Sequence, residues 1–110
     1  MTTLDFDNFI DAGFHAWSAG ALAADRYKDD NGTCNFDSVD LYIDSNMSKC
    51  AEVLKRLDFL ILGKKRNFLR IGSPFGGQAM KNTAACEAIA KAFNDFKIPG
   101  ITAYVNYRMD

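Results

Sequence analysis

The sequence is poor in the residues that build metal sites, disulfide frameworks and membrane spans. Its 110 residues include one histidine, one tryptophan, two prolines and three cysteines. An odd number of cysteines without C-x-x-C spacing argues against both a secreted disulfide scaffold and a zinc site. The longest strongly apolar run covers residues 59–62, far short of the roughly 18 residues that a membrane span needs. We therefore expect no metal, no cofactor and no membrane partner.

The first residues also lack the features of a secretory signal. Residues 1–7 carry two aspartates and no basic residue, whereas a signal peptide starts with a basic segment followed by an apolar one. Together with the cysteine pattern, this predicts a reducing, cytoplasmic environment. The length of 110 residues and the apolar fraction of 48% predict one globular domain over residues 1–110, stabilised by its own core.

The formal net charge of −1 conceals two parts of opposite sign. Residues 1–45 contain nine Asp against Arg26 and Lys28, a net charge of −7. Residues 46–110 contain eleven Lys and Arg against five acidic residues, a net charge of +6. The total gives no support to a uniformly basic nucleic-acid-binding protein. It directs attention instead to an acidic connection at residues 25–37 and a basic turn at residues 64–66.

Hydrophobic periodicity predicts three helices and four strands. Apolar residues recur every three or four positions over residues 5–27, 46–58 and 78–96, which is typical of helices. Residues 39–44 and 101–108 alternate as strands do, residues 59–62 read as a short buried strand, and a turn at residues 63–67 leads to its hairpin partner at residues 68–71. After the first helix the order is β-α-β-β-α-β, the ferredoxin-like pattern.

We therefore predict an α+β fold with two parts. An accessory N-terminal helix occupies residues 1–28, and a βαββαβ ferredoxin-like sandwich occupies residues 36–108. The sandwich is expected to contain a four-stranded antiparallel sheet with both of its helices on one face. Many unrelated functions share this architecture, so the fold alone assigns no activity.

Alternation along the strands predicts which side chains face the helices. The inward set is Val39, Leu41, Ile43, Leu69, Ile71, Ile101, Ala103, Val105 and Tyr107. The outward set is Asp40, Tyr42, Asp44, Phe68, Arg70, Thr102, Tyr104, Asn106 and Arg108. Three aromatic residues on the outward face suggest that something covers it. We favour the N-terminal helix in this role, followed by a second copy of the chain and then by a ligand.

The sequence does not contain a complete catalytic constellation. The only histidine, His15, has no obligatory partner; a pair with Cys34 is the one combination available for nucleophilic chemistry. Gly72 and Gly77 have the spacing of a phosphate-binding P-loop, but Gln78 stands where that motif needs lysine. An enzyme is therefore not expected. A small anion- or ligand-binding protein or enzyme that uses the loop from Gly72 to Gln78 remains an alternative, with the predicted residues Gly76, Gly77 and Gln78.

The leading hypothesis is a small non-enzymatic protein-binding module. It would act as an adaptor, a subunit or an inhibitor of the kind that mobile elements encode, through charged loops or the open sheet face. Its partner is another protein or a second copy of itself. Charge in the acidic segment would set the encounter rate and the choice of partner. The predicted contact residues are Asp25, Asp29, Asp30, Asp37 and Asp40.

Nucleic-acid binding is the second hypothesis. Residues 41–47 resemble the first-strand signature of the RNA-recognition motif, a family that stacks bases on aromatics of its two central strands. Within residues 65–71, only Phe68 matches the second signature. The basic residues would contact phosphates and the aromatic ones would stack on bases. The predicted residues are Lys64, Lys65, Arg66 and Arg70 for the first role, and Tyr42, Phe68 and Tyr104 for the second.

Overall fold

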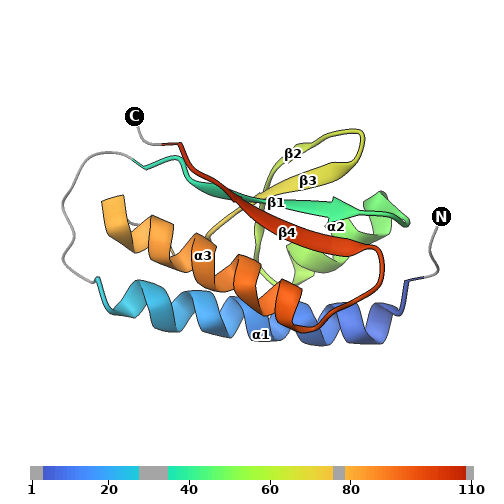
Figure 1. Ribbon diagram of the computed structural model, residues 1–110, viewed down its shortest axis with the longest axis horizontal. Helices are drawn as coiled ribbons and strands as arrows, with labels where there is room; N and C mark the ends of the chain where they lie inside the picture. Colours follow the sequence, from blue (N-terminus) through green and yellow to red (C-terminus); the bar gives the residue numbers. More distant parts are fainter. Residues whose placement is uncertain (1–3, 28–34, 76–78, 109–110) are drawn as a thin grey trace.

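The computed structural model describes residues 4–27, 35–75 and 79–108 (Figure 1). Its helices and strands follow the predicted order, and each boundary lies within two residues of the predicted one. The elements are α1 (Phe6–Asp25), β1 (Ser38–Ile43), α2 (Met47–Arg56), β2 (Leu60–Lys64), β3 (Phe68–Gly72), α3 (Ala79–Asp95) and β4 (Ile101–Asn106). None of the described helices is long and apolar enough to cross a membrane.

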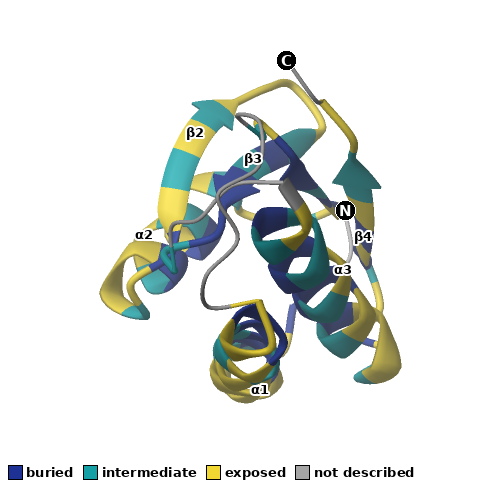
Figure 2. Cartoon of the chain, turned by 90° about the vertical axis from the view of Figure 1, so that its left-hand side faces the viewer, coloured by how far each residue is buried: buried dark blue, intermediate teal, exposed yellow. Residues whose placement is uncertain are grey.

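The four strands form one antiparallel sheet in the order β2-β3-β1-β4. The central strand β1 pairs with β3 and β4, so that Leu41 stands opposite both Leu69 and Ala103. On one face of the sheet, α2 packs against β2 and β3 while α3 packs against β1 and β4 (Figure 2). The predicted α+β class, with an antiparallel sheet and these two helices on one face, is confirmed.

The sequence analysis favours α1 as the cover of the other face of the sheet. The structure shows that α1 does not lie on that face. It lies beneath the helices and packs along α3, so that the molecule has a sheet layer, a layer of α2 and α3, and α1 outermost (Figures 1 and 2). Phe9 of α1 reaches between the helices to Phe93 of α3, with the ring centroids 6.0 Å apart. The apolar side of α1 packs against the side of α3 that is turned away from the sheet, and no described helix covers the opposite face of the sheet.

Two glycines allow α1 to approach the helix layer closely. A Cβ atom at Gly20 would lie 2.8 Å from Cε2 of Phe75 and 2.9 Å from Cγ1 of Ile89. At Gly13, a Cβ atom would lie 2.5 Å from Cδ1 of Leu57. Helical glycine costs about 1 kcal/mol relative to alanine. At Gly20 the cost is accepted because a side chain would push α1 away from Ile89 of α3 and from Phe75, whereas at Gly13 only the end of the Leu57 side chain would have to move.

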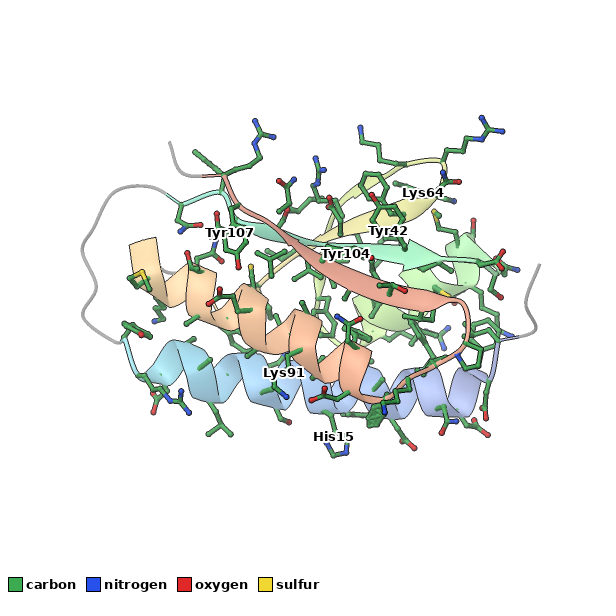
Figure 3. The ribbon with its side chains drawn as sticks, viewed as in Figure 1. His15, Tyr42, Lys64, Lys91, Tyr104 and Tyr107 are labelled. Carbon is green, nitrogen blue, oxygen red and sulfur yellow. The ribbon has the colours of Figure 1, made fainter. Side chains whose placement is uncertain are left out.

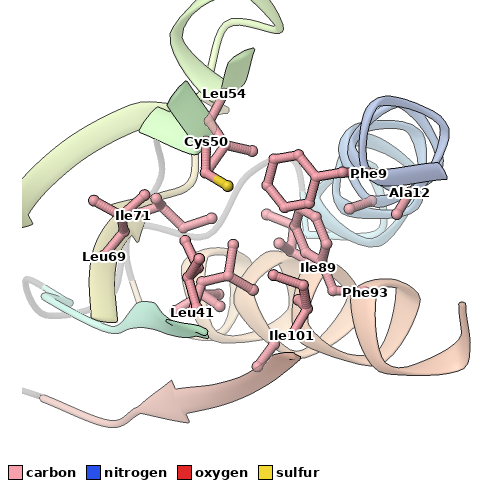
Figure 4. Close-up of a cluster of buried hydrophobic side chains, with 14 of the residues drawn as sticks. Phe9, Ala12, Leu41, Cys50, Leu54, Leu69, Ile71, Ile89, Phe93 and Ile101 are labelled. Carbon is pink, nitrogen blue, oxygen red and sulfur yellow. The ribbon is translucent and has the colours of Figure 1, made fainter. Parts of the chain in front are cut away.

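The inward side chains of the strands form the core together with the helices (Figure 4). Leu41, Leu69 and Ile71 are fully buried, and Ile101 is 7% exposed. Tyr107 is the exception to the predicted inward set, because it follows the end of β4 and is 60% exposed. Its hydroxyl donates a hydrogen bond of 2.7 Å to Glu87 on α3.

Strand β2 differs most from its prediction. Residues 59–62 were expected to form a buried strand, yet Leu60 and Leu62 are 51% and 56% exposed. The predicted turn also begins later, because Gly63 and Lys64 belong to β2, whose register with β3 shifts between Ile61 and Gly63. The reason is position: β2 is an edge strand, and no described helix covers the face of the sheet on which Leu60 and Leu62 are exposed (Figure 2).

Candidate functional site

The uncovered side of the sheet, which we call the open face, carries the candidate site. It contains side chains from all four strands that point away from α2 and α3. Figure 3 shows Tyr42 and Tyr104 on this side, with His15 of α1 at the opposite side of the molecule. The open face comprises Asp40, Tyr42, Leu60, Leu62, Phe68, Arg70, Thr102 and Tyr104.

Three aromatic side chains form a contiguous cluster on the open face. Tyr42 and Phe68 stand opposite each other on β1 and β3, with ring centroids 5.0 Å apart. Tyr104 on β4 meets Tyr42 edge-to-face at 5.6 Å and an interplanar angle of 88°. Such pairing orients the rings, and Tyr42 and Tyr104 are still 40% and 58% exposed. The sequence predicted all three on this face; their contact follows from the strand register.

An ion pair lies beside the aromatic cluster. Arg70 donates hydrogen bonds to both carboxylate oxygens of Asp40, at 2.8 and 3.1 Å. These bonds raise the pKa of Arg70 above its ordinary value, because they favour the charged guanidinium. The guanidinium carbon also lies 5.5 Å from the ring centroid of Phe68. Asp40 was predicted to contact a protein and Arg70 to contact a nucleic acid. Each of them instead has the other as a partner within the chain, and the pair lies on the open face.

The basic turn borders the open face at the β2–β3 hairpin. Lys64, Lys65 and Arg66 are all exposed. The ammonium group of Lys64 donates a hydrogen bond of 2.6 Å to the hydroxyl of Ser48 on α2. Lys65 and Arg66 belong to the connection between β2 and β3, and Phe68 of the aromatic cluster begins β3. Of the predicted basic residues, Arg70 lies beside the ring of Phe68, whereas Lys64 is bonded to α2.

The acidic residues predicted to bind a protein do not form one surface. Asp25 is exposed at the end of α1, Asp40 is paired with Arg70, and Asp29 and Asp30 lie outside the described residues. Asp37 is only 4% exposed. Its two carboxylate oxygens accept hydrogen bonds of 2.6 Å from the Thr83 hydroxyl and from the backbone N–H of Arg108.

Asp37 is therefore not an exposed docking residue but the centre of a buried polar network. Its backbone carbonyl accepts a hydrogen bond of 3.0 Å from Asn82, and its backbone N–H donates one of 2.7 Å to Asn35. The network ties the start of β1 to α3 and to the segment after β4. Aspartate was predicted at the surface because single-sequence patterns do not show which carboxylates find buried donors.

The thiols and the histidine form no catalytic group among the described residues. Burial raises the pKa of Cys50 to about 11 and that of Cys86 to about 12, so both thiols stay protonated near neutral pH. His15 packs its ring against Phe96 with centroids 5.1 Å apart. Its predicted partner Cys34 lies outside the described residues, as do Gly76, Gly77 and Gln78. No cluster of three metal-ligating side chains occurs within the described ranges.

The sequence analysis missed the two leucines of β2 as surface residues. The continuous apolar run at residues 59–62 concealed its alternation, and only the edge position of β2 places Leu60 and Leu62 on the open face.

Searches of protein-family models, of curated proteins and of solved structures each find no match to this chain. Its function must therefore be inferred from the geometry of these residues.

Proposed function

We propose that the chain is a small protein-binding module that docks its partner on the open face. The observation that carries this proposal is the set of exposed apolar and aromatic side chains there. Tyr42, Leu60, Leu62 and Tyr104 are 40–58% exposed on one sheet face. Large exposed apolar patches on small domains mark binding surfaces, and tyrosine is enriched in the centres of protein interfaces.

The charges around the open face indicate the chemistry of the partner. Lys65 and Arg66 are exposed at one end, whereas the carboxylate of Asp40 near the centre is neutralised by Arg70. A complementary surface is therefore apolar where it meets Leu62 and Tyr104, and acidic where it meets the hairpin. The acids set the encounter rate and orientation, and the buried apolar contacts supply most of the affinity.

The architecture supports this proposal without carrying it. We propose the ferredoxin-like sandwich for residues 36–108 and a single domain for residues 1–110. Support for the first comes from the β-α-β-β-α-β order and from β1 pairing with both β3 and β4. Support for the second comes from the core cluster, which joins Phe9 of α1 to side chains of α2, α3 and the sheet. An accessory helix on the helix layer leaves the open face available.

A matched pair of variants tests the proposal. Leu62→Ser with Tyr104→Ser alters the open face, and Leu22→Ser with Phe14→Ser alters exposed positions of α1, where these side chains are 69% and 58% exposed. A partner is captured from native cells with tagged wild-type chain, purified, and measured directly by calorimetry. We expect the open-face variant to lose at least about tenfold in affinity and the α1 variant to bind like the wild type. Equal affinity for all three chains would overturn the proposal.

Nucleic-acid binding is the second candidate function, favoured by one specific observation. In the aromatic cluster of Tyr42, Phe68 and Tyr104, the ring of Phe68 lies 5.5 Å from the guanidinium carbon of Arg70, and Phe68 follows the exposed Arg66 by two residues. Aromatic platforms beside basic residues bind single strands by stacking and by phosphate contact. Fluorescence anisotropy with labelled oligo(U) and oligo(dT) at low salt decides this alternative. Binding that weakens with salt and is lost in Tyr42→Ala would replace the protein partner by a nucleic acid.

A further inference from the structure

A hollow lies at the end of the sheet where β1 and β2 begin and where β3 ends. Its volume is about 620 Å³, within the range of roughly 300–1,000 Å³ that is usual for small-molecule sites. Side chains from the segments around it supply apolar, hydroxyl and cationic groups. Those that the argument uses are Phe36, Ser38, Leu60, Leu62, Arg70 and Arg108.

Leu60 and Leu62 form an apolar wall of the hollow, and the absence of a side chain at Gly72 leaves room for them. Leu60 and Leu62 of β2 lean over Gly72 of β3: a Cβ atom at Gly72 would lie 3.1 Å from Cδ1 of Leu62 and 3.5 Å from Cβ of Leu60. Both leucines nevertheless keep more than half of their surface exposed. An apolar group placed in the hollow would therefore gain contact with these side chains and remove their surface from water.

The hydroxyl of Ser38 is one of two buried polar side-chain groups that find no hydrogen-bond partner among the described residues, the other being the indole N–H of Trp17. Ser38 is 1% exposed, and its Oγ makes no hydrogen bond to any described residue. A buried hydroxyl in this state costs folding free energy. Ser38 is among the residues that line the hollow, and a ligand atom that reaches its Oγ there would supply the missing hydrogen bond.

The charges around the hollow are unequal in their availability. Asp37 is another residue of the lining, and its carboxylate already accepts hydrogen bonds from Thr83 and from the backbone of Arg108. The carboxylate of Asp40 accepts two bonds from Arg70. Arg108, by contrast, is an exposed residue of the lining, and its guanidinium is available to a ligand. An anionic ligand therefore matches the hollow better than a cationic one.

We propose that the hollow binds a small organic anion: a carboxylate carried on a compact apolar or aromatic body. The carboxylate accepts hydrogen bonds from the hydroxyl of Ser38 and from the guanidinium of Arg108, and the apolar body packs against Leu60 and Leu62. The site shares Leu60 and Leu62 with the open face, so an anion bound in the hollow and a partner docked on these leucines would exclude each other, and the anion is tested on the chain alone.

Phenylacetate is the probe for this site, and phenylacetamide is its neutral match. In titrations followed by two-dimensional amide NMR, we expect phenylacetate to shift the signals of Ser38 and Gly72 with a dissociation constant on the order of 1 mM. Phenylacetamide lacks the charge and is expected to bind about tenfold more weakly. If phenylacetate shifts neither signal, or if the two probes bind equally, the hollow is not an anion site.

Ser38→Ala separates a binding role from a structural one. It removes an unpartnered buried hydroxyl, so we expect it to raise Tm while weakening phenylacetate binding about tenfold. Arg108→Gln should weaken binding similarly without lowering Tm, because Asp37 uses the backbone N–H of this residue and not its side chain. Lys55→Gln, on the exposed side of α2, is the charge control. Unchanged binding by Ser38→Ala or Arg108→Gln, or weakening by the control as well, would overturn the proposal.

Discussion

Asp40 of β1 and Arg70 of β3 stand directly opposite each other in the sheet and are joined by two parallel hydrogen bonds. Their side chains are only 14% and 26% exposed, although the face that carries them is uncovered. We attribute part of this shielding to the aromatic ring of Phe68, whose centroid lies 5.5 Å from the guanidinium carbon of Arg70. The pair is therefore less screened than an ordinary surface ion pair.

This shielding predicts a measurable coupling free energy. In a double-mutant cycle of Asp40→Asn and Arg70→Met, urea unfolding should give a coupling of about 1 kcal/mol between the two residues. The Glu52–Arg56 pair on α2 has similar hydrogen-bond length, 2.7 Å, but its side chains are 62% and 78% exposed. Its cycle should give a clearly smaller value. Equal coupling in both cycles would show that the aromatic rings provide no shielding.

The two close glycines of α1 predict opposite results for the same substitution. Gly20→Ala places a methyl group against the ring of Phe75 and the side chain of Ile89, and such overpacking costs about 1–3 kcal/mol. Gly13→Ala meets only the tip of Leu57, which can rotate away, so the helical preference for alanine prevails. Thermal unfolding should show a lower Tm for the first variant and an unchanged or higher Tm for the second. A higher Tm for Gly20→Ala would contradict this packing.

The buried network around Asp37 predicts a large loss of stability. Asp37→Ala leaves the Thr83 hydroxyl and the backbone N–H of Arg108 without their acceptor, and we expect a loss of about 2–4 kcal/mol in the free energy of unfolding. Asp11→Ala, at an exposed position of α1, is the control and should stay within about 0.5 kcal/mol of the wild type. Chemical denaturation of both variants makes the comparison. Similar losses in the two would mean that the network contributes nothing.

The buried thiols predict how stability changes at alkaline pH. Burial raises the pKa of Cys50 from 9.0 to about 11 and that of Cys86 to about 12. The unfolded chain therefore ionises its thiols first, and stability that is present below pH 9.0 is lost as the pH rises towards these values. Between about pH 8 and about pH 10, the urea midpoint of the wild type should fall more than that of a Cys50→Ala, Cys86→Ala variant. If the urea midpoints of the two chains fell equally with pH, the burial of the two thiols would not be the cause of the loss of stability.

The sequence predicted the elements well because their signals are local. Asp5 and Asn46 accept hydrogen bonds from the backbone N–H three residues on and so begin α1 and α2 where expected. The alternation of Val39, Leu41 and Ile43 correctly identified the core face. What local patterns could not give was the partner of α1, because its apolar side fits the helix layer as well as it fits a sheet. The buried donors around Asp37 are equally long-range, since Thr83 lies 46 residues away.

The position of α1 also imposes an order on the folding of a nascent chain. The residues that close against α1 include Ile89 and Phe93 of α3, which the ribosome adds long after α1 has emerged. Contacts at such separation are slow to form. Helix α1 must therefore wait with its apolar side unburied until α3 has been synthesised. Codon usage or chaperone access between residues 25 and 95 would consequently affect yield more strongly than the same changes elsewhere in the coding sequence.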